Sequence, residues 1–251
     1  FALCLRGRQA LATALPLGLT ALMAPAWLAL LRTHSIQHGW FTWRALGVTL
    51  TSYLAAAQML AVWQETPALE RGRAIAVGLP VNLRNYFPSD TARNFFNTIR
   101  VAHVFTGDET LDTLAPELDA KLKAELSPER IMARMDGFQR FERIPGVRPV
   151  PLPVKNAVVG LCNWVESRKV TFTLSNMGRV QTAPELAPYI KGFAAYCSSD
   201  GLFTTVCSYG GDLVLGSVSA LRSTNILRNF YRSLAESGLA VTLYASEVET
   251  E

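Results

Sequence analysis

Histidine and cysteine are scarce in this sequence, and they are not clustered. The chain of 251 residues has 3 histidines and 4 cysteines, and it contains no CxxC pair. A zinc site needs several such ligands at short spacing, so no bound metal is expected. We expect the cysteines to be reduced and buried, as in a cytosolic protein. They are Cys4, Cys162, Cys197 and Cys207.

Charge is also sparse, because charged residues make up 18% of the chain and the net charge is only +4. No run of basic residues is present, so nucleic acid is not expected as a partner. Hydrophobic residues account for 49% of the chain, which excludes an intrinsically disordered protein. The length is sufficient for one large domain or two small ones with a buried core.

An N-terminal stretch of 23 residues, 9–31, contains no charged residue. Its length is that of a membrane span, which favours a membrane anchor or a membrane-interface segment. Pro16 and Pro25 interrupt a continuous helix, which favours one or two buried or interfacial helices instead. A secretory signal peptide is the third interpretation of this stretch.

These patterns divide the chain into an apolar linker or membrane-associated segment, 1–44, and a C-terminal subdomain, 45–251. The expected location is the cytoplasm, with membrane association through the stretch 9–31 as the open alternative. Because residue 1 is phenylalanine, we expect the chain to begin inside a longer polypeptide or after processing.

Hydrophobic patterns typical of strands and of helices follow one another along the C-terminal subdomain. The predicted strands are 73–79, 95–105, 170–175, 202–209, 212–218 and 240–245. The predicted helices are 48–64, 110–125, one that begins at 127, 154–165 and 224–237. This order predicts a mixed α/β fold rather than a regular βαβ array or a repeat protein.

Four stretches of the sequence occur in the order found in one enzyme superfamily. They are GVTLTSYLAAA (47–57), LPVNLRNYFPSDTARNFFN (79–97), TFTLSNMGRV (171–180) and ILRNFYRSLAESGLAVTLYAS (226–246). Together they resemble the C-terminal half of CoA-dependent acyltransferases of the chloramphenicol-acetyltransferase-like superfamily. Within it they are most similar to bacterial alcohol O-acetyltransferases and polyketide-associated acyltransferases. The resemblance implies a mixed-sheet, two-layer α/β sandwich that is one half of a two-half fold.

The histidine motif of that superfamily, HHxxxDG, is absent from this chain. In the superfamily the second histidine is the general base. His103 has no histidine beside it, and Asp108 follows it by five residues rather than four. A lone histidine on an apolar strand is usually structural, so we do not expect His103 to be the base. The resemblance therefore implies an N-terminal, histidine-bearing half as a partner and no catalytic residue in this chain.

Three residues resemble groups that support the active site in the superfamily. Arg84, in PVNLR, resembles the arginine that in condensation domains pairs with the aspartate of the histidine motif, a task suited to a planar fork of donors. Asn97 and Thr98, in FFNT, resemble the strand that lines the acyl channel. The alternative is structural: a solvated arginine at a strand end and polar residues that satisfy a strand terminus.

The SNMG turn resembles a substrate-binding element. Gly178 is predicted to supply an unusual φ, and the side chain of Ser175 or Asn176 to donate to a carbonyl oxygen. A purely structural turn is the alternative, because asparagine and serine favour turns in all proteins.

The resemblance implies an O-acyltransferase subdomain. It would transfer an acyl group, above all acetyl, from CoA or a carrier thioester to a small-molecule alcohol. Acyl-CoA would be a co-substrate, and no metal would be needed. Two alternatives remain open: a noncatalytic interaction module of the same fold, and a condensation-type domain that joins carrier-bound acyl groups to amines.

Overall fold

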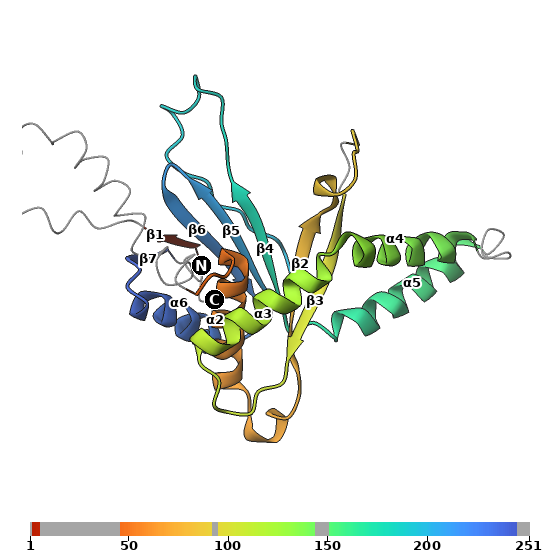
Figure 1. Ribbon diagram of the computed structural model, residues 1–251, viewed down its shortest axis with the longest axis horizontal. Helices are drawn as coiled ribbons and strands as arrows, with labels where there is room; N and C mark the ends of the chain where they lie inside the picture. The colour runs from red at the N-terminus through yellow and green to blue at the C-terminus, as the bar shows by residue number, and fades with distance from the viewer. Residues whose placement is uncertain (1, 6–45, 92–94, 144–150, 245–251) are drawn as a thin grey trace, which may run out of the picture.

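The computed structural model describes residues 2–5, 46–91, 95–143 and 151–244. They form one seven-stranded mixed sheet in the order β3-β2-β4-β5-β6-β1-β7 (Figure 1). The strands are β1 (Ala2–Leu5), β2 (Ile75–Asn82), β3 (Phe96–His103), β4 (Phe172–Arg179), β5 (Leu202–Tyr209), β6 (Asp212–Ser219) and β7 (Val241–Tyr244). The helices are α2 (Leu50–Glu65), α3 (Leu111–Glu125), α4 (Pro128–Arg143), α5 (Leu152–Ser167) and α6 (Asn225–Glu236).

Helix α2 lies over the middle of the sheet, with α3 on one side and α6 on the other. It packs closely because it presents small side chains, and Ala55, Ala56 and Ala57 are all buried. Thr49 caps its N-terminus and accepts a hydrogen bond from the backbone N–H of Ser52, as a threonine before an apolar helix predicts. The helices and the sheet form two layers, and the prediction of a mixed α/β sandwich is confirmed.

Helices α4 and α5 extend away from this packed body (Figure 1). Most described side chains of α5 are exposed, including Val158, Leu161 and Trp164. Cys162 on the same helix is exposed, and so is Cys197 in the β4–β5 connection, while Cys207 is buried in β5. The expectation of buried cysteines is therefore wrong for Cys162 and Cys197, because their segments contact too little of the described protein to be covered.

Strand β1 was not predicted from the sequence. It runs antiparallel between β6 and β7, with Ala2 opposite Gly216 on one side and Tyr244 on the other. Residues 6–45, and with them the stretch 9–31, lie outside the described residues. Within the described ranges, no helix combines the length and apolarity that crossing a membrane requires.

Candidate functional site

The parallel strands β2 and β4 pair only briefly and then diverge toward their carboxyl ends (Figure 1). Their ladder consists of the pairs Val77–Phe172 and Gly78–Thr173. In open α/β sheets, ligands bind at the carboxyl ends of parallel strands where neighbouring chains separate. The residues proposed from the sequence all come to this end: Arg84 after β2, Asn97 and Thr98 in β3, and Ser175, Asn176 and Gly178 in β4.

The end of β4 is fixed by a β-bulge between Asn176 and Gly178. Gly178 has φ +74°, so the predicted left-handed conformation is confirmed. The side-chain oxygen of Asn176 accepts from the Gly178 N–H at 2.8 Å, and its Nδ2 donates to Oγ1 of Thr51 at 2.9 Å. Both ends of the Asn176 amide are therefore engaged, and they hold the bulge against the first turn of α2.

Ser175 differs from Asn176 in the hydrogen bonding of its side chain. It is half-buried, and it lies opposite Thr205 in the β4–β5 ladder. The side chain of Thr205 bonds to the carbonyl of Ala195, on the sheet face opposite the helices. Within the described part of the chain, no hydrogen bond involves the Ser175 hydroxyl. Of the two polar side chains in the SNMG turn, that of Ser175 is thus the one that remains available as a donor.

Asn97 and Thr98 point to opposite faces of the sheet, because consecutive side chains on a strand alternate. Thr98 is exposed. Its Cγ2 lies close to Gly78 of the neighbouring strand β2, 3.4 Å from the position that a Cβ atom on this glycine would occupy. Asn97 is half-buried on the side of Ile99, a core residue. Thr98 and Ser175 therefore lie on the sheet face opposite the helices, and Asn97 and Asn176 lie on the helix face, with β2 between the two strands that carry them.

Arg84 is exposed in a short 3₁₀ helix, Leu83–Asn85, directly after β2. Its backbone N–H donates to Oδ1 of Asn82 at 3.0 Å, and its Nη2 donates to the carbonyl of Thr91 at 2.7 Å. The bond to Thr91 holds the guanidinium against the loop that leads into β3. The pairing of Arg84 with an aspartate of another half stays a prediction.

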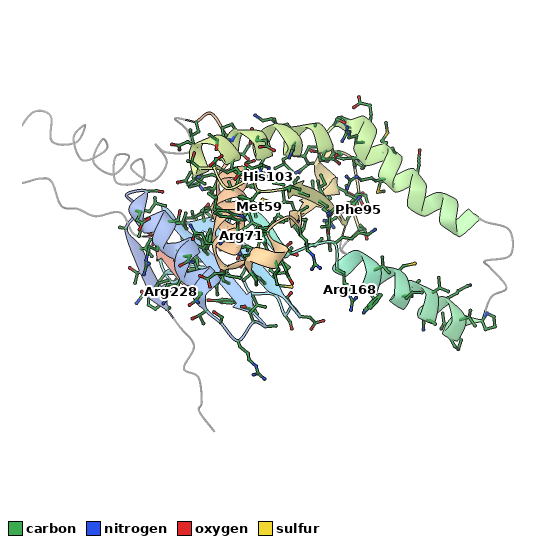
Figure 2. All side chains as sticks on the ribbon, turned by 90° about the horizontal axis from the view of Figure 1, so that it is seen from below. Met59, Arg71, Phe95, His103, Arg168 and Arg228 are labelled. Carbon is green, nitrogen blue, oxygen red and sulfur yellow. The ribbon has the colours of Figure 1, made fainter. Side chains whose placement is uncertain are left out.

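His103 lies at the other end of β3, beside α3 (Figure 2). Its Nδ1 is 2.9 Å from Oε1 of Glu117, and its Nε2 is 3.3 Å from Oε1 of Glu109. The backbone N–H of Thr106 is the main reason that the pKa of Glu109 is lowered to about 2. Both ring nitrogens lie within hydrogen-bonding distance of carboxylates that are part of the fold, so this geometry suits a structural residue rather than a catalytic base.

We expect His103→Ala to lower the stability of the protein. The change removes one of the links between β3 and α3, another being the bond from Lys121 to the carbonyl of Ala102. It also leaves two carboxylates without their shared partner, so the loss should be about 1–2 kcal/mol. Thermal unfolding of the variant checks this prediction, and an unfolding temperature equal to that of the wild type would contradict the structural role of His103.

No protein-family model and no curated protein matches this chain. Among solved structures, the nonribosomal peptide synthetase FmoA3 matches 95% of this chain at 15% identity, with a TM-score of 0.51, over 21% of its own length. Polyketide synthase associated protein 5 from Mycobacterium tuberculosis matches 81% of this chain at 16% identity (TM-score 0.47, 47% of its length). A condensation domain of the enacyloxin polyketide synthase matches 100% at 13% identity (TM-score 0.46, 43% of its length).

This chain therefore spans less than half the length of each of these structures. At such identities the likeness shows the fold alone, and the FmoA3 match is the one on which it rests. The fold is a mixed α/β, two-layer fold that is shared with part of FmoA3.

Proposed function

We propose that this chain is one half of an acyl-transfer domain of the condensation type, which takes its acyl group from a carrier-bound thioester. The observation that carries the proposal is the gathering of all six motif residues at the diverging ends of β2 and β4, with no histidine among them. A site of this composition supplies donors and walls but no general base. The base is therefore assigned to a histidine-bearing half.

The proposed role of each site residue follows from its position on the sheet and from the charge that develops during acyl transfer. As the acceptor attacks the thioester, negative charge develops on the carbonyl oxygen and needs positioned donors. Ser175 is the candidate donor on the sheet face opposite the helices, and Thr98 lies on the same face two strands away, in β3. Asn176 acts indirectly, because its amide holds the bulge that orients Ser175. Arg84 would anchor the histidine-bearing half through its aspartate.

An alcohol acceptor with acyl-CoA as the donor is the second candidate. It is favoured by the similarity of the four sequence stretches, taken together, to alcohol O-acetyltransferases. The carrier-bound alternative is preferred because the fold is shared with a nonribosomal peptide synthetase. The two candidates differ in both substrates, so one set of assays separates them.

The test combines this chain with a histidine-bearing half and offers two donors, acetyl-CoA and an acetylated phosphopantetheinyl carrier protein. Each donor is incubated with a simple amine and with a simple alcohol, and products are measured by mass spectrometry. We expect no product from this chain alone and amide product from the carrier in the assembled enzyme. Ester formed from acetyl-CoA would support the second candidate instead. No product from the assembled enzyme with any pair would favour a noncatalytic module.

Ser175→Ala tests the oxyanion assignment within that assay. Removal of one oxyanion donor typically lowers kcat by about 100-fold or more, and we expect a loss of that order with little change in KM. Thr242→Ala, which also removes a side-chain hydroxyl, from an exposed position of strand β7, is the control and should leave kcat unchanged. Equal kcat values for the two variants would remove Ser175 from the site.

A further inference from the structure

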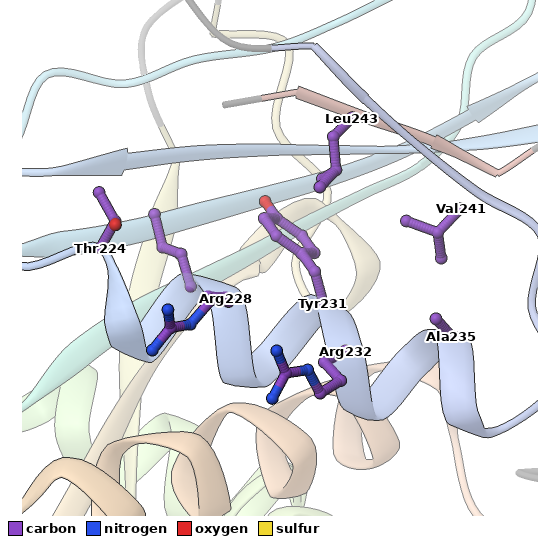
Figure 3. A pocket seen from close by; sticks show the side chains of 8 residues that line it. Thr224, Arg228, Tyr231, Arg232, Ala235, Val241 and Leu243 are labelled. Carbon is purple, nitrogen blue, oxygen red and sulfur yellow. The ribbon is translucent and has the colours of Figure 1, made fainter.

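A cavity of about 380 Å³ lies between α6 and the edge strand β7 (Figure 3). Its size is within the usual range of small-molecule sites. The walls are formed largely by the apolar side chains Leu227, Val241 and Leu243 and by the ring of Tyr231. The cavity lies at the opposite edge of the sheet from β3, four strands beyond β4, so the residues at the ends of β2 and β4 do not line it.

Two guanidinium groups stand along this cavity, those of Arg228 and Arg232 (Figure 3). They are four residues apart on α6, which places their Cβ atoms roughly 5–6 Å apart. None of the eight lining residues is acidic. Like charges at this spacing destabilise a helix, so an anion between them would relieve their repulsion.

The carboxylates near α6 form no ion pair with these arginines in the described part of the chain. Glu65 instead accepts hydrogen bonds from Asn225 and Asn229, at 3.0 and 2.9 Å. Glu236, four residues after the second arginine, is exposed at the end of α6. Arg228 donates to Oδ1 of Asn225, an uncharged group, at 3.0 Å. Both guanidinium groups therefore lie beside an apolar cavity without a carboxylate partner among the described residues.

Tyr231 contributes apolar surface to the cavity rather than a polar group. Its hydroxyl is turned toward the sheet and donates to Oγ of Ser217 at 2.7 Å (Figure 3). Burial raises the pKa of Tyr231 to about 12, so the phenol stays neutral and adds no negative charge. The cavity thus combines apolar walls with two cations along one side.

We propose that this cavity binds an amphipathic carboxylate, with the alkyl chain against Leu227, Val241 and Leu243 and the carboxylate between Arg228 and Arg232. Guanidinium groups match carboxylates through paired N–H donors, which suits this head group. The apolar walls select against a small hydrophilic anion. The inference stands on the cavity and its charges, and it does not depend on the acyl-transfer proposal.

Titration calorimetry of this chain with decanoate tests the site, with decyltrimethylammonium and decanol as cationic and neutral probes of equal chain length. We expect decanoate to bind with one site per chain, and the other two probes to bind at least tenfold more weakly. Arg228→Gln combined with Arg232→Gln should weaken decanoate binding by tenfold or more. The control replaces Arg222 and Lys191 by Gln, which removes the same charge from exposed positions outside the cavity.

Filling the cavity provides an independent variant. Ala235 lines it and is exposed on α6, where leucine fits a helix, so Ala235→Leu should weaken decanoate binding while both arginines remain. Circular dichroism confirms that each variant is folded. Equal binding of decyltrimethylammonium, or unchanged decanoate binding in both the double arginine variant and Ala235→Leu, would overturn the proposal.

Discussion

Replacing Val158 by Lys and Leu161 by Glu should weaken association with the proposed histidine-bearing half about 100-fold. Both side chains are exposed on α5, at 46% and 62% of their surface, beside further exposed apolar residues. Contiguous apolar surface of this kind marks interfaces. Burial of two such side chains is worth roughly 3 kcal/mol, which corresponds to about a factor of 100 in affinity. The occupant follows from the proposed function, in which a histidine-bearing half completes the acyl-transfer domain.

The same double variant should remove most of the binding of a hydrophobic dye by the isolated chain. Lysine and glutamate are good helix formers and introduce no net charge, so α5 should remain helical. Leu69→Glu is the control, because Leu69 is fully exposed but isolated in a short 3₁₀ helix, Ala68–Glu70. Dye binding that falls equally in the control and in the double variant would show that α5 contributes no more to dye binding than an isolated exposed leucine. Unchanged association of the halves would exclude it from their interface.

The main elements of the fold could be predicted from local patterns. Each of the six predicted strands is present, and two adjacent glycines, Gly210 and Gly211, form the turn between β5 and β6 with φ of +61° and +101°. Strand β1 could not be predicted, because four residues of ALCL carry almost no periodic signal and their partners are more than 200 positions away in sequence. Such a strand forms because it pairs with strands that are distant in sequence, and its own composition does not predict it.

The site shows a similar division between local and nonlocal information. The sequence motifs identify residues that the fold gathers at one end of the sheet, and the conformation of Gly178 was predictable from its turn. Thr51 was not singled out as a site residue, because its contact with Asn176 joins residues 125 positions apart. The separation of Asn97 and Thr98 onto opposite faces follows from strand alternation and could have been stated from the sequence.

Asp119 is another residue whose importance depends on a distant partner, and its replacement should have the largest effect on stability. It lies on α3 with 4% of its surface exposed. Its Oδ1 accepts from the backbone N–H of Thr49 at 3.0 Å and from Oγ of Ser52 at 2.7 Å, and Lys123 lies 2.6 Å from Oδ2. Asp119→Ala leaves the donors at the start of α2 without their acceptor. We expect the free energy of unfolding to fall by about 3 kcal/mol.

The pH dependence of this loss distinguishes a charged acceptor from a packing effect. Burial raises the pKa of Asp119, but the hydrogen bonds from Lys123, Thr49 and Ser52 together outweigh it and hold the pKa below the ordinary value of 3.8. A carboxyl whose pKa is lower in the folded state stabilises the protein above its unfolded pKa, and this contribution is lost as the pH falls below it. The unfolding free energies of wild type and Asp119→Ala should therefore differ most near neutrality and converge as the pH falls below 3.8. Asp136→Ala, an exposed change on α4, should show no such convergence. A difference between wild type and Asp119→Ala that stays constant from neutral to acidic pH would assign the effect to lost packing rather than to the carboxylate.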